Sequence, residues 1–301
     1  SSFVIADPSV ITPDKSHDGK WHLFCHTFFG VRHYESENGI DFTFKSKIVN
    51  RAMRPNINYI DGRYYLFYER TKPVLLNLLA LAGFEWKSEI YCTESADFSE
   101  WSDPYPVITQ SRYYEKDSHG TAISNPYLIK ENDRYRMYYS CGQTFIKDCG
   151  FCEPTHISFA ESDCITNGFV SREKPIISPD KNIEYLNLCS GCLKVYKLKD
   201  CYIGLQNGLF EKDGKTYHHL LDPETGYPAQ SGVVSVTVVS ESGILSDALS
   251  TACFVLGVEK GSGLADEYGA KAVFITKDKK IIPSDGLELE ITDNGYTLVS
   301  R

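Results

Sequence analysis

Alternating apolar and polar positions dominate the first two thirds of the chain and recur as a repeated unit. Each unit begins with an apolar segment, crosses a polar turn and continues into an alternating segment rich in aromatic residues. Alternation with a period of two predicts strands, and Asp-Gly at residues 18–19 and 61–62 is a strong hairpin signal. We therefore expect two antiparallel strands in each copy. The four copies begin at Ala6, Arg54, Ser124 and Ser190.

A second pair of strands is predicted after each of the first three copies, at residues 31–42, 88–101 and 156–169. Four strands per unit, with units about 45 to 70 residues apart, are typical of the blades of a β-propeller. The predicted fold class is therefore mainly β, with a β-propeller of about four blades over residues 1–207. The inner strands of such blades line a central funnel.

The pattern changes after residue 207. Residues 217–228 predict a strand that runs into a turn, and the β-branched residues 233–239 predict a second strand. A helix is predicted over residues 246–257, with Ser246 as its N-cap and Gly257 as its stop. A second helix at 259–268 and a strand at 272–276 follow, so residues 208–301 are predicted to form a smaller α+β segment.

Composition and charge narrow the classes of function. The chain is 42% hydrophobic with 20 tyrosines, which is enough for a buried core, and its net charge of −9 argues against nucleic-acid binding. No segment approaches the roughly 20 apolar residues of a membrane span. No signal peptide is recognisable at Ser1, so a bacterial-type cytoplasmic or extracytoplasmic localisation is left open.

Two of the cysteine pairs have the CxxC spacing of zinc knuckles. Cys149 and Cys152 form one pair, and Cys189 and Cys192 form the other. The alternative is that these cysteines are small buried side chains of a β-rich core. We favour this alternative over a zinc site.

The segment up to about residue 207 resembles the five-bladed β-propeller glycoside hydrolases of the family 43 type and their family 32, 68 and 130 relatives. The resemblance rests on the repeat and on the opening Ala6-Asp7-Pro8. It implies a carbohydrate ligand and the hydrolysis of glycosidic bonds, with Asp7 as the general base. The alternative for Asp7 is a turn acid before a proline.

Two other positions of that family's pattern differ in this chain. Residues 125–126 read Asn-Pro where the family has Asp-Pro, and residues 190–192 read Ser-Gly-Cys where the family places its general acid in Glu-Gly-Pro. Glu184 and Glu69 are the candidate substitutes for the acid. The alternative, which we favour for both, is a solvated or hairpin-pairing carboxylate. Binding of a glycan is therefore a more secure expectation than its hydrolysis.

Asp247 and Thr251 lie four residues apart in the first predicted helix. A carboxylate and a hydroxyl at this spacing share one helix face and offer hard oxygen ligands suited to Mg²⁺. The alternative is a capping aspartate and a threonine bonded to the backbone, and spacing alone favours it.

Residues from about 210 onward resemble the C-terminal part of the ApbE-type flavin transferases, which move FMN from FAD onto a Ser or Thr of a target protein. Two motifs carry this resemblance, His-His-x-x-Asp-Pro-x-Thr-Gly-x-Pro at 218–228 and Asp-Ala-Leu-Ser-Thr-Ala at 247–252. It implies FAD and Mg²⁺ as cofactors, with Asp247 and Thr251 as metal ligands. It also implies that His218 or, by a slight preference, His219 assists the transfer. The expected cofactor-binding residues are Asp222, Thr225 and Gly226.

Both resemblances are incomplete at the same place. The propeller lacks a fifth blade where the transferase begins without its N-terminal half, and residues 208–215 suit a hairpin of either kind. We interpret the chain as a chimera of residues 1–207 and 208–301. Three functions are left open: a propeller that acts on or binds carbohydrate, an Mg²⁺-dependent FAD:protein FMN transferase, and a non-functional composite.

Overall fold

The computed structural model describes residues 6–27, 29–71, 86–117, 120–146, 151–217, 220–291 and 295–300. The chain is mainly β and divides into two compact units, Ser1–Tyr217 and His218–Arg301. His218, His219 and Cys149 lie outside the described residues. No helix in the described part of the chain is both long and apolar enough to cross a membrane.

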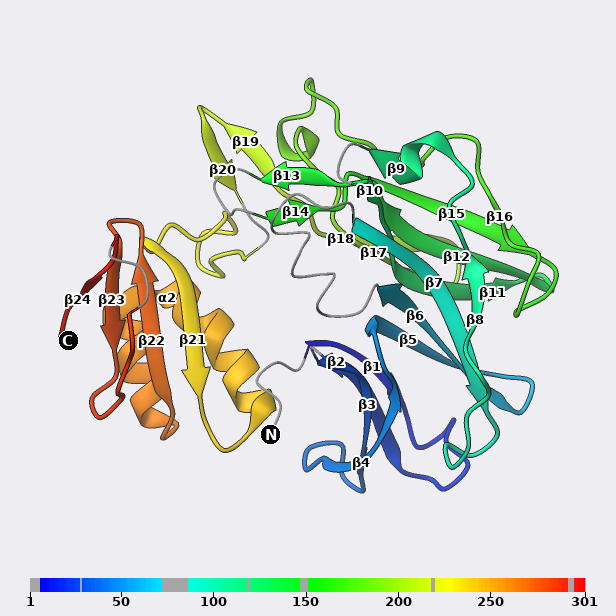
Figure 1. The fold of residues 1–301 in the computed structure, drawn as a ribbon, viewed down its shortest axis with the longest axis horizontal. Coiled ribbons are helices and arrows are strands. Elements are labelled where there is room, and N and C mark those ends of the chain that lie inside the picture. The colour runs from blue at the N-terminus through cyan, green and yellow to red at the C-terminus, as the bar shows by residue number, and fades with distance from the viewer. Residues whose placement is uncertain are drawn as a thin grey trace. The chain divides into compact units, whose positions relative to one another are not determined.

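The first unit contains three four-stranded antiparallel blades followed by a two-stranded sheet (Figure 1). Blade 1 consists of β1 (Ala6–Ile11), β2 (Trp21–Thr27), β3 (Gly30–Ser36) and β4 (Thr43–Val49). Blade 2 consists of β5 (Ala52–Ile60), β6 (Arg63–Thr71), β7 (Trp86–Ser95) and β8 (Tyr105–Ile108). Blade 3 consists of β11 (Ile123–Glu131), β12 (Arg134–Cys141), β15 (His156–Ser162) and β16 (Val170–Ser171). The fourth sheet consists of β17 (Leu193–Lys197) and β18 (Tyr202–Gln206).

Shorter elements connect these sheets. Blade 2 is extended by β10, which runs parallel to β7, and by β9. Two separate hairpins, β13–β14 and β19–β20, pair only within themselves. Their bounds, with those of the two 3₁₀ helices, are β9 (Lys116–Asp117), β10 (Gly120–Thr121), β13 (Thr144–Ile146), β14 (Phe151–Glu153), β19 (Phe210–Lys212), β20 (Lys215–Tyr217), η1 (Tyr113–Glu115) and η2 (Glu184–Leu186).

The predicted turns of blades 2 and 3 form for the expected reason, whereas the predicted two-residue turn at Asp18-Gly19 is wrong, because residues 12–20 form a longer connection between β1 and β2. The β5–β6 turn places Asp61 at φ 50° and Gly62 at φ 82°, and the β11–β12 turn places Asn132 at φ 48° and Asp133 at φ 61°. Positive φ at both central residues is what a two-residue turn needs to match the twist of its strands. Gly, Asn and Asp reach this region at the least cost.

Successive blades pack face to face. One cluster joins blades 1 and 2 through Phe24, Ile57, Tyr64 and Leu66, and a second joins blades 2 and 3. On the fourth sheet, every residue of β18 is exposed. This exposure follows from an incomplete propeller, because no strand in the described part of the unit pairs with the outer edge of β18.

The second unit is an α+β structure. The sheet of β21 (Val233–Val239), β22 (Lys271–Thr276), β23 (Lys280–Pro283) and β24 (Thr297–Leu298) packs against helix α2 (Gly243–Glu267). Leu249, Cys253 and Phe274 form its core. The predicted break at Gly257 is confirmed, because its backbone leaves the helical region at φ 78° and ψ −176°.

The predicted N-cap of the helix is wrong by one turn. The helix begins after Ser242, whose Oγ accepts a hydrogen bond from the Leu245 N–H at 3.3 Å. Ser246 lies inside the helix, where its N–H donates to the Ser242 carbonyl at 2.9 Å. Both serines suit a cap, and the earlier one is used because β21 ends at Val239.

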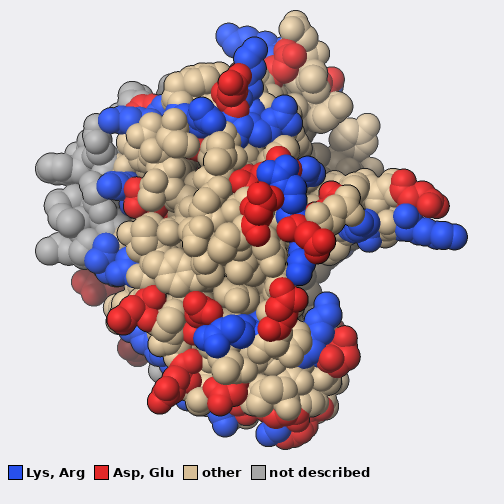
Figure 2. Space-filling model, turned by 90° about the vertical axis from the view of Figure 1, so that its right-hand side faces the viewer, with Lys and Arg blue, Asp and Glu red and all other residues tan. Residues whose placement is uncertain are grey.

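Charges of both signs are mixed on the surface. On the face drawn in Figure 2, Lys and Arg side chains lie interspersed with Asp and Glu. The described residues of this face therefore form no continuous basic patch of the kind that a nucleic-acid backbone would bind.

Candidate functional site

The first residues of the four inner strands surround one pocket. Asp7, Arg54 and Asn125 each stand directly before a proline at the start of β1, β5 and β11, and Gly191 lies two residues before Leu193, where β17 begins. The pocket encloses about 380 Å³ of space, part of it open to solvent. Its lining residues are Asp7, Pro8, Arg54, Pro55, Asn125, Pro126, Tyr127, Cys192, Leu193 and Lys194.

These strand ends share an unusual backbone conformation. Asp7, Arg54 and Asn125 have φ of 51°, 51° and 52°, and Gly191 has φ of 60°. Each proline-containing strand also shifts register at this point. A residue with a side chain loses about 1–3 kcal/mol of stability in the left-handed backbone conformation, and such residues are frequent at functional sites. The repeat therefore turns one side chain per blade toward a common centre by the same local distortion.

Side chains two residues further along link the inner strands. Ser9 Oγ accepts from the Ile57 N–H at 3.0 Å, and Asn56 Oδ1 accepts from the Leu128 N–H at 3.0 Å. Each bond occupies an inner-strand N–H at the register shift of the next blade. The same hydrogen bond between neighbouring blades therefore recurs beside the pocket.

Asp7 presents an accessible carboxylate beside a buried imidazole. Its side chain is 49% exposed, and its Oδ2 lies 3.2 Å from Nδ1 of His26 in β2. The Arg54 backbone N–H donates to the same nitrogen at 3.3 Å. Burial lowers the pKa of His26 more than the Asp7 carboxylate raises it. His26 therefore ties the first two inner strands together, while Asp7 stays open to a ligand.

Glu69 is held in an ion pair with Arg54. Its side chain is 1% exposed, and its Oε2 contacts Arg54 Nη1. Although burial alone would lower it, the carboxylates of Glu69 and Asp7 raise the pKa of Arg54. This geometry favours the hairpin-pairing interpretation of Glu69, because its buried carboxylate is occupied by the Arg54 guanidinium.

Glu184 lies away from the pocket. It begins the short helix η2, is exposed, and pairs with Lys212 Nζ at 2.6 Å. It is not among the residues that line the pocket. The geometry thus favours the solvated interpretation of this carboxylate.

Glu153 is an acid that the sequence reasoning missed. It ends β14, and the carbonyl of the next residue, Pro154, accepts from the N–H groups of Ser190 at 3.1 Å and Gly191 at 3.3 Å. The end of β14 therefore lies against the segment where the glycosidase resemblance expects its general acid. Burial raises the pKa of Glu153, and the nearby Arg54 offsets this only in part. The available signal was a Glu-Pro pair directly after a cysteine knuckle.

The cysteines of the CxxC pairs lie in different surroundings. Cys189 is buried with Ile146 and Leu209, whereas Cys192 lines the pocket and its thiol donates to Asn207 Oδ1 at 2.9 Å. Cys152 lies in β14, opposite Phe145. Among the described residues, no cluster of metal-ligating side chains includes one of these cysteines.

The first flavin-transferase motif forms a turn stabilised by its own side chains. The Asp222 N–H donates to the Tyr227 carbonyl at 2.8 Å, and Asp222 Oδ1 accepts from the Glu224 N–H at 2.9 Å. Thr225 Oγ1 accepts from the Tyr227 N–H at 3.3 Å, and Gly226 has a positive φ of 70°. The histidines that precede this turn, His218 and His219, lie outside the described residues.

Asp247 and Thr251 both lie in the first half of α2 and both are exposed. The Asp247 carbonyl accepts from Ser250 Oγ at 2.8 Å. At a spacing of four residues on a continuous helix, the two side chains share one face. Their hard oxygen atoms fit the preferences of Mg²⁺.

Comparison with known proteins identifies different relatives for the C-terminal region and for most of the remaining chain. The ApbE family model matches residues 203–274, starting inside β18. An FAD:protein FMN transferase of Treponema pallidum is 43% identical over 97 residues, which is 31% of this chain and 27% of that protein. One from Klebsiella pneumoniae is 40% identical over 99 residues, or 32% of this chain and 31% of that protein. The chain therefore spans less than a third of these relatives, and the predicted C-terminal resemblance is confirmed.

Three of the similar solved structures are glycoside hydrolases. A thermostable family-43 glycoside hydrolase is similar with a TM-score of 0.36 and 16% identity, and the match covers 75% of this chain and 96% of the hydrolase chain. A family 117 glycoside hydrolase of Zobellia galactanivorans has a TM-score of 0.48 and 14% identity and covers 70% and 64%. A Bacillus subtilis arabinoxylan arabinofuranohydrolase has a TM-score of 0.47 and 15% identity and covers 69% and 43%.

Proposed function

We propose that the first unit binds carbohydrate in the pocket formed by the ends of its inner strands and hydrolyses a glycosidic bond there. The observation that carries this proposal is the accessible carboxylate of Asp7 in the pocket. Glu153 is the proposed acid: it does not itself line the pocket, but burial raises its pKa, and the next residue, Pro154, accepts hydrogen bonds from Ser190 and Gly191. Arg54, Asn125 and Lys194 supply polar groups for sugar hydroxyls, and Tyr127 with the prolines supplies apolar surface.

Each carboxyl has a distinct role in this reaction. Asp7 takes a proton from water as the water oxygen attacks the anomeric carbon, and Glu153 gives its proton to the departing glycosidic oxygen as the carbon–oxygen bond breaks. Half exposure leaves the Asp7 carboxylate in reach of water, while burial raises the pKa of Glu153. The difference in environment therefore separates base from acid.

A panel of aryl and alkyl glycosides tests this assignment. Asp7→Asn should abolish turnover while binding, followed by calorimetry, is retained. Glu153→Gln should lower the rate by about 10²- to 10⁴-fold with alkyl glycosides and by much less with nitrophenyl glycosides, because a good leaving group needs little protonation. Glu173→Gln is the matched control, since Glu173 is exposed and does not line the pocket.

Two results would count against the proposal. Turnover that is unchanged in Asp7→Asn would remove the base from its role. No turnover and no glycan-induced shift in melting temperature, in a protein with native tryptophan fluorescence, would leave the pocket without a carbohydrate ligand.

We propose a second function, FAD binding, for the C-terminal segment. It is favoured by the 43% identity to a transferase over 97 residues and by the shared helix face of Asp247 and Thr251. These two residues would hold Mg²⁺, which neutralises the charge of the pyrophosphate when bound. The turn of Asp222, Thr225 and Gly226 would contact FAD, and His218 or His219 would assist transfer. Complete transfer of FMN to a protein is the more demanding part of this proposal.

FAD titration with and without Mg²⁺, followed by flavin fluorescence anisotropy, tests the second function. Asp247→Ala should remove the Mg²⁺-dependent part of the affinity. Glu259→Gln, on an exposed position of the same helix, should leave it unchanged. Equal FAD affinity in all three proteins would exclude the assigned metal ligands, and no affinity at all would exclude FAD as a ligand.

A further inference from the structure

Blade 1 contains a cluster of nitrogen and oxygen ligands that neither proposed function uses. His22 in β2 and His33 and Glu35 in β3 place one ligand atom each within 4.8 Å of one another. Among the described residues this is the one group of three or more such side chains that close together. It combines two imidazoles with one carboxylate, a set found in zinc and non-haem iron sites.

Strand register explains why these side chains meet. His22 lies directly opposite Glu35 in the β2–β3 pair, and His33 lies two residues before Glu35 on the same strand. Positions opposite or two apart point to the same face of a sheet. The cluster is therefore fixed by the antiparallel ladder and not by flexible loops.

The two imidazoles are buried and oriented toward one another. His22 is 0% exposed and His33 is 2% exposed, and His22 Nδ1 lies 2.9 Å from His33 Nε2. Two nitrogens bound to one tetrahedral zinc ion lie about 3.3 Å apart, given zinc–nitrogen distances of about 2.0–2.1 Å. Separating these nitrogens by a few tenths of an ångström would therefore make room for the bonds to an ion.

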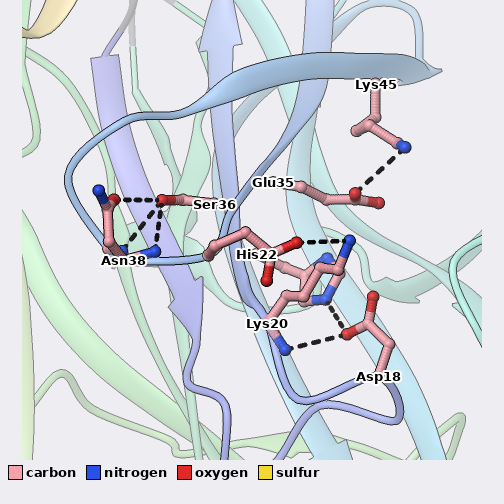
Figure 3. Close-up of polar contacts among 9 residues, drawn as sticks. Asp18, Lys20, His22, Glu35, Ser36, Asn38 and Lys45 are labelled. Atoms are coloured by element: carbon pink, nitrogen blue, oxygen red, sulfur yellow. Dashed lines mark hydrogen bonds and ion pairs between the residues drawn. The ribbon is translucent and has the colours of Figure 1, made fainter.

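His22 has a carboxylate partner of the kind that usually orients a metal-ligating histidine. The other nitrogen of His22, Nε2, lies 2.8 Å from the Asp18 carboxylate, as Figure 3 shows. A carboxylate on the far side of a ligating histidine fixes its orientation and tautomer.

We infer that His22, His33 and Glu35 form a site for a divalent transition metal of the zinc type, with Asp18 as the carboxylate that orients His22. Glu35 is 19% exposed and pairs with Lys45 Nζ at 3.1 Å (Figure 3), so the site approaches the surface on that side. The ion fastens β2 to β3 beside the packing contact of blades 1 and 2.

Zinc binding to the full chain, measured by calorimetry after chelator treatment, tests the inference. One zinc ion per chain should bind at this site and raise the melting temperature of the protein, followed by tryptophan fluorescence. His33→Gln should weaken that binding by more than about 100-fold, and Asp18→Asn by about 10- to 100-fold, as expected for an outer partner. His156→Gln is the matched control, because His156 lies in blade 3 and bonds Ser178 Oγ at 3.0 Å.

Two further measurements keep the inference falsifiable. If a histidine variant fails to fold, Glu35→Gln leaves both imidazoles in place and should still weaken binding. Cobalt substitution should give visible d–d bands without the near-ultraviolet bands of thiolate ligation. Zinc affinity equal in His33→Gln, Glu35→Gln and His156→Gln, or a cobalt spectrum with thiolate bands alone, would overturn the site.

Discussion

Replacing Glu69 with glutamine should destabilise the first unit, because it removes the partner of a largely buried cation. The Glu69 side chain is 1% exposed, and that of its partner Arg54 is 30% exposed. Removing one member of a buried ion pair typically costs about 3–5 kcal/mol, since the other charge is left uncompensated. Water reaches part of Arg54, so we expect the free energy of unfolding to fall by about 2–3 kcal/mol.

Tryptophan fluorescence during thermal or urea unfolding measures this effect on the first unit alone. The three tryptophans of the chain, Trp21, Trp86 and Trp101, all lie in that unit. At about 2–4 °C per kcal/mol for a unit of this size, the melting temperature should fall by about 4–12 °C.

An exposed pair provides the control for this experiment. The side chains of Arg134 and Asp163 are 58% and 83% exposed, and exposed pairs contribute less than about 1 kcal/mol. Asp163→Asn should therefore change the melting temperature little. A loss in Glu69→Gln no larger than this would refute the view that Glu69 is a structural partner of Arg54.

Three further predictions concern single positions. Hydrogen bonds with Thr166 lower the pKa of the exposed Cys164, whereas burial raises the pKa of Cys25 to about 12. Iodoacetamide should therefore label Cys164 near neutral pH and Cys25 only after unfolding, which peptide mapping would measure. Gly257→Ala should destabilise α2 by about 1–2 kcal/mol because of its φ of 78°, measured by circular dichroism at the helix band; an unchanged transition would contradict this. Ser242→Ala should lower the stability of the helix by about 1 kcal/mol in the same assay. A larger loss of stability in Ser246→Ala would instead support Ser246 as the N-cap.

Features set by local chemistry could be predicted from the sequence. The turn at Asp61-Gly62 and the helix break at Gly257 depend on the φ angles that these residues tolerate, and both occur as expected. The mainly β class, the repeated strand pairs and the C-terminal α+β pattern followed from periodicity in the same way. The division at residue 207 and the roles of the site residues stay predictions.

Features set by long-range register could not be predicted. Nothing in the local pattern brings Glu153 next to Ser190, because that approach depends on hydrogen bonds to the Pro154 carbonyl. The pairing of Arg54 with Glu69 and the meeting of His22 with His33 likewise depend on how two strands align. A shift of one residue would have sent these side chains to opposite faces of the sheet.

Hydrogen–deuterium exchange of the full chain, with a bound glycan and then with FAD and Mg²⁺, tests most directly whether two separate sites exist. The account predicts that the glycan protects amides of the pocket segments around residues 6–9, 54–57, 125–128 and 192–194 and leaves the second unit unchanged. FAD should instead protect residues 222–227 and the first half of α2. Protection by the glycan outside the pocket segments, or by either ligand in both units alike, would contradict it.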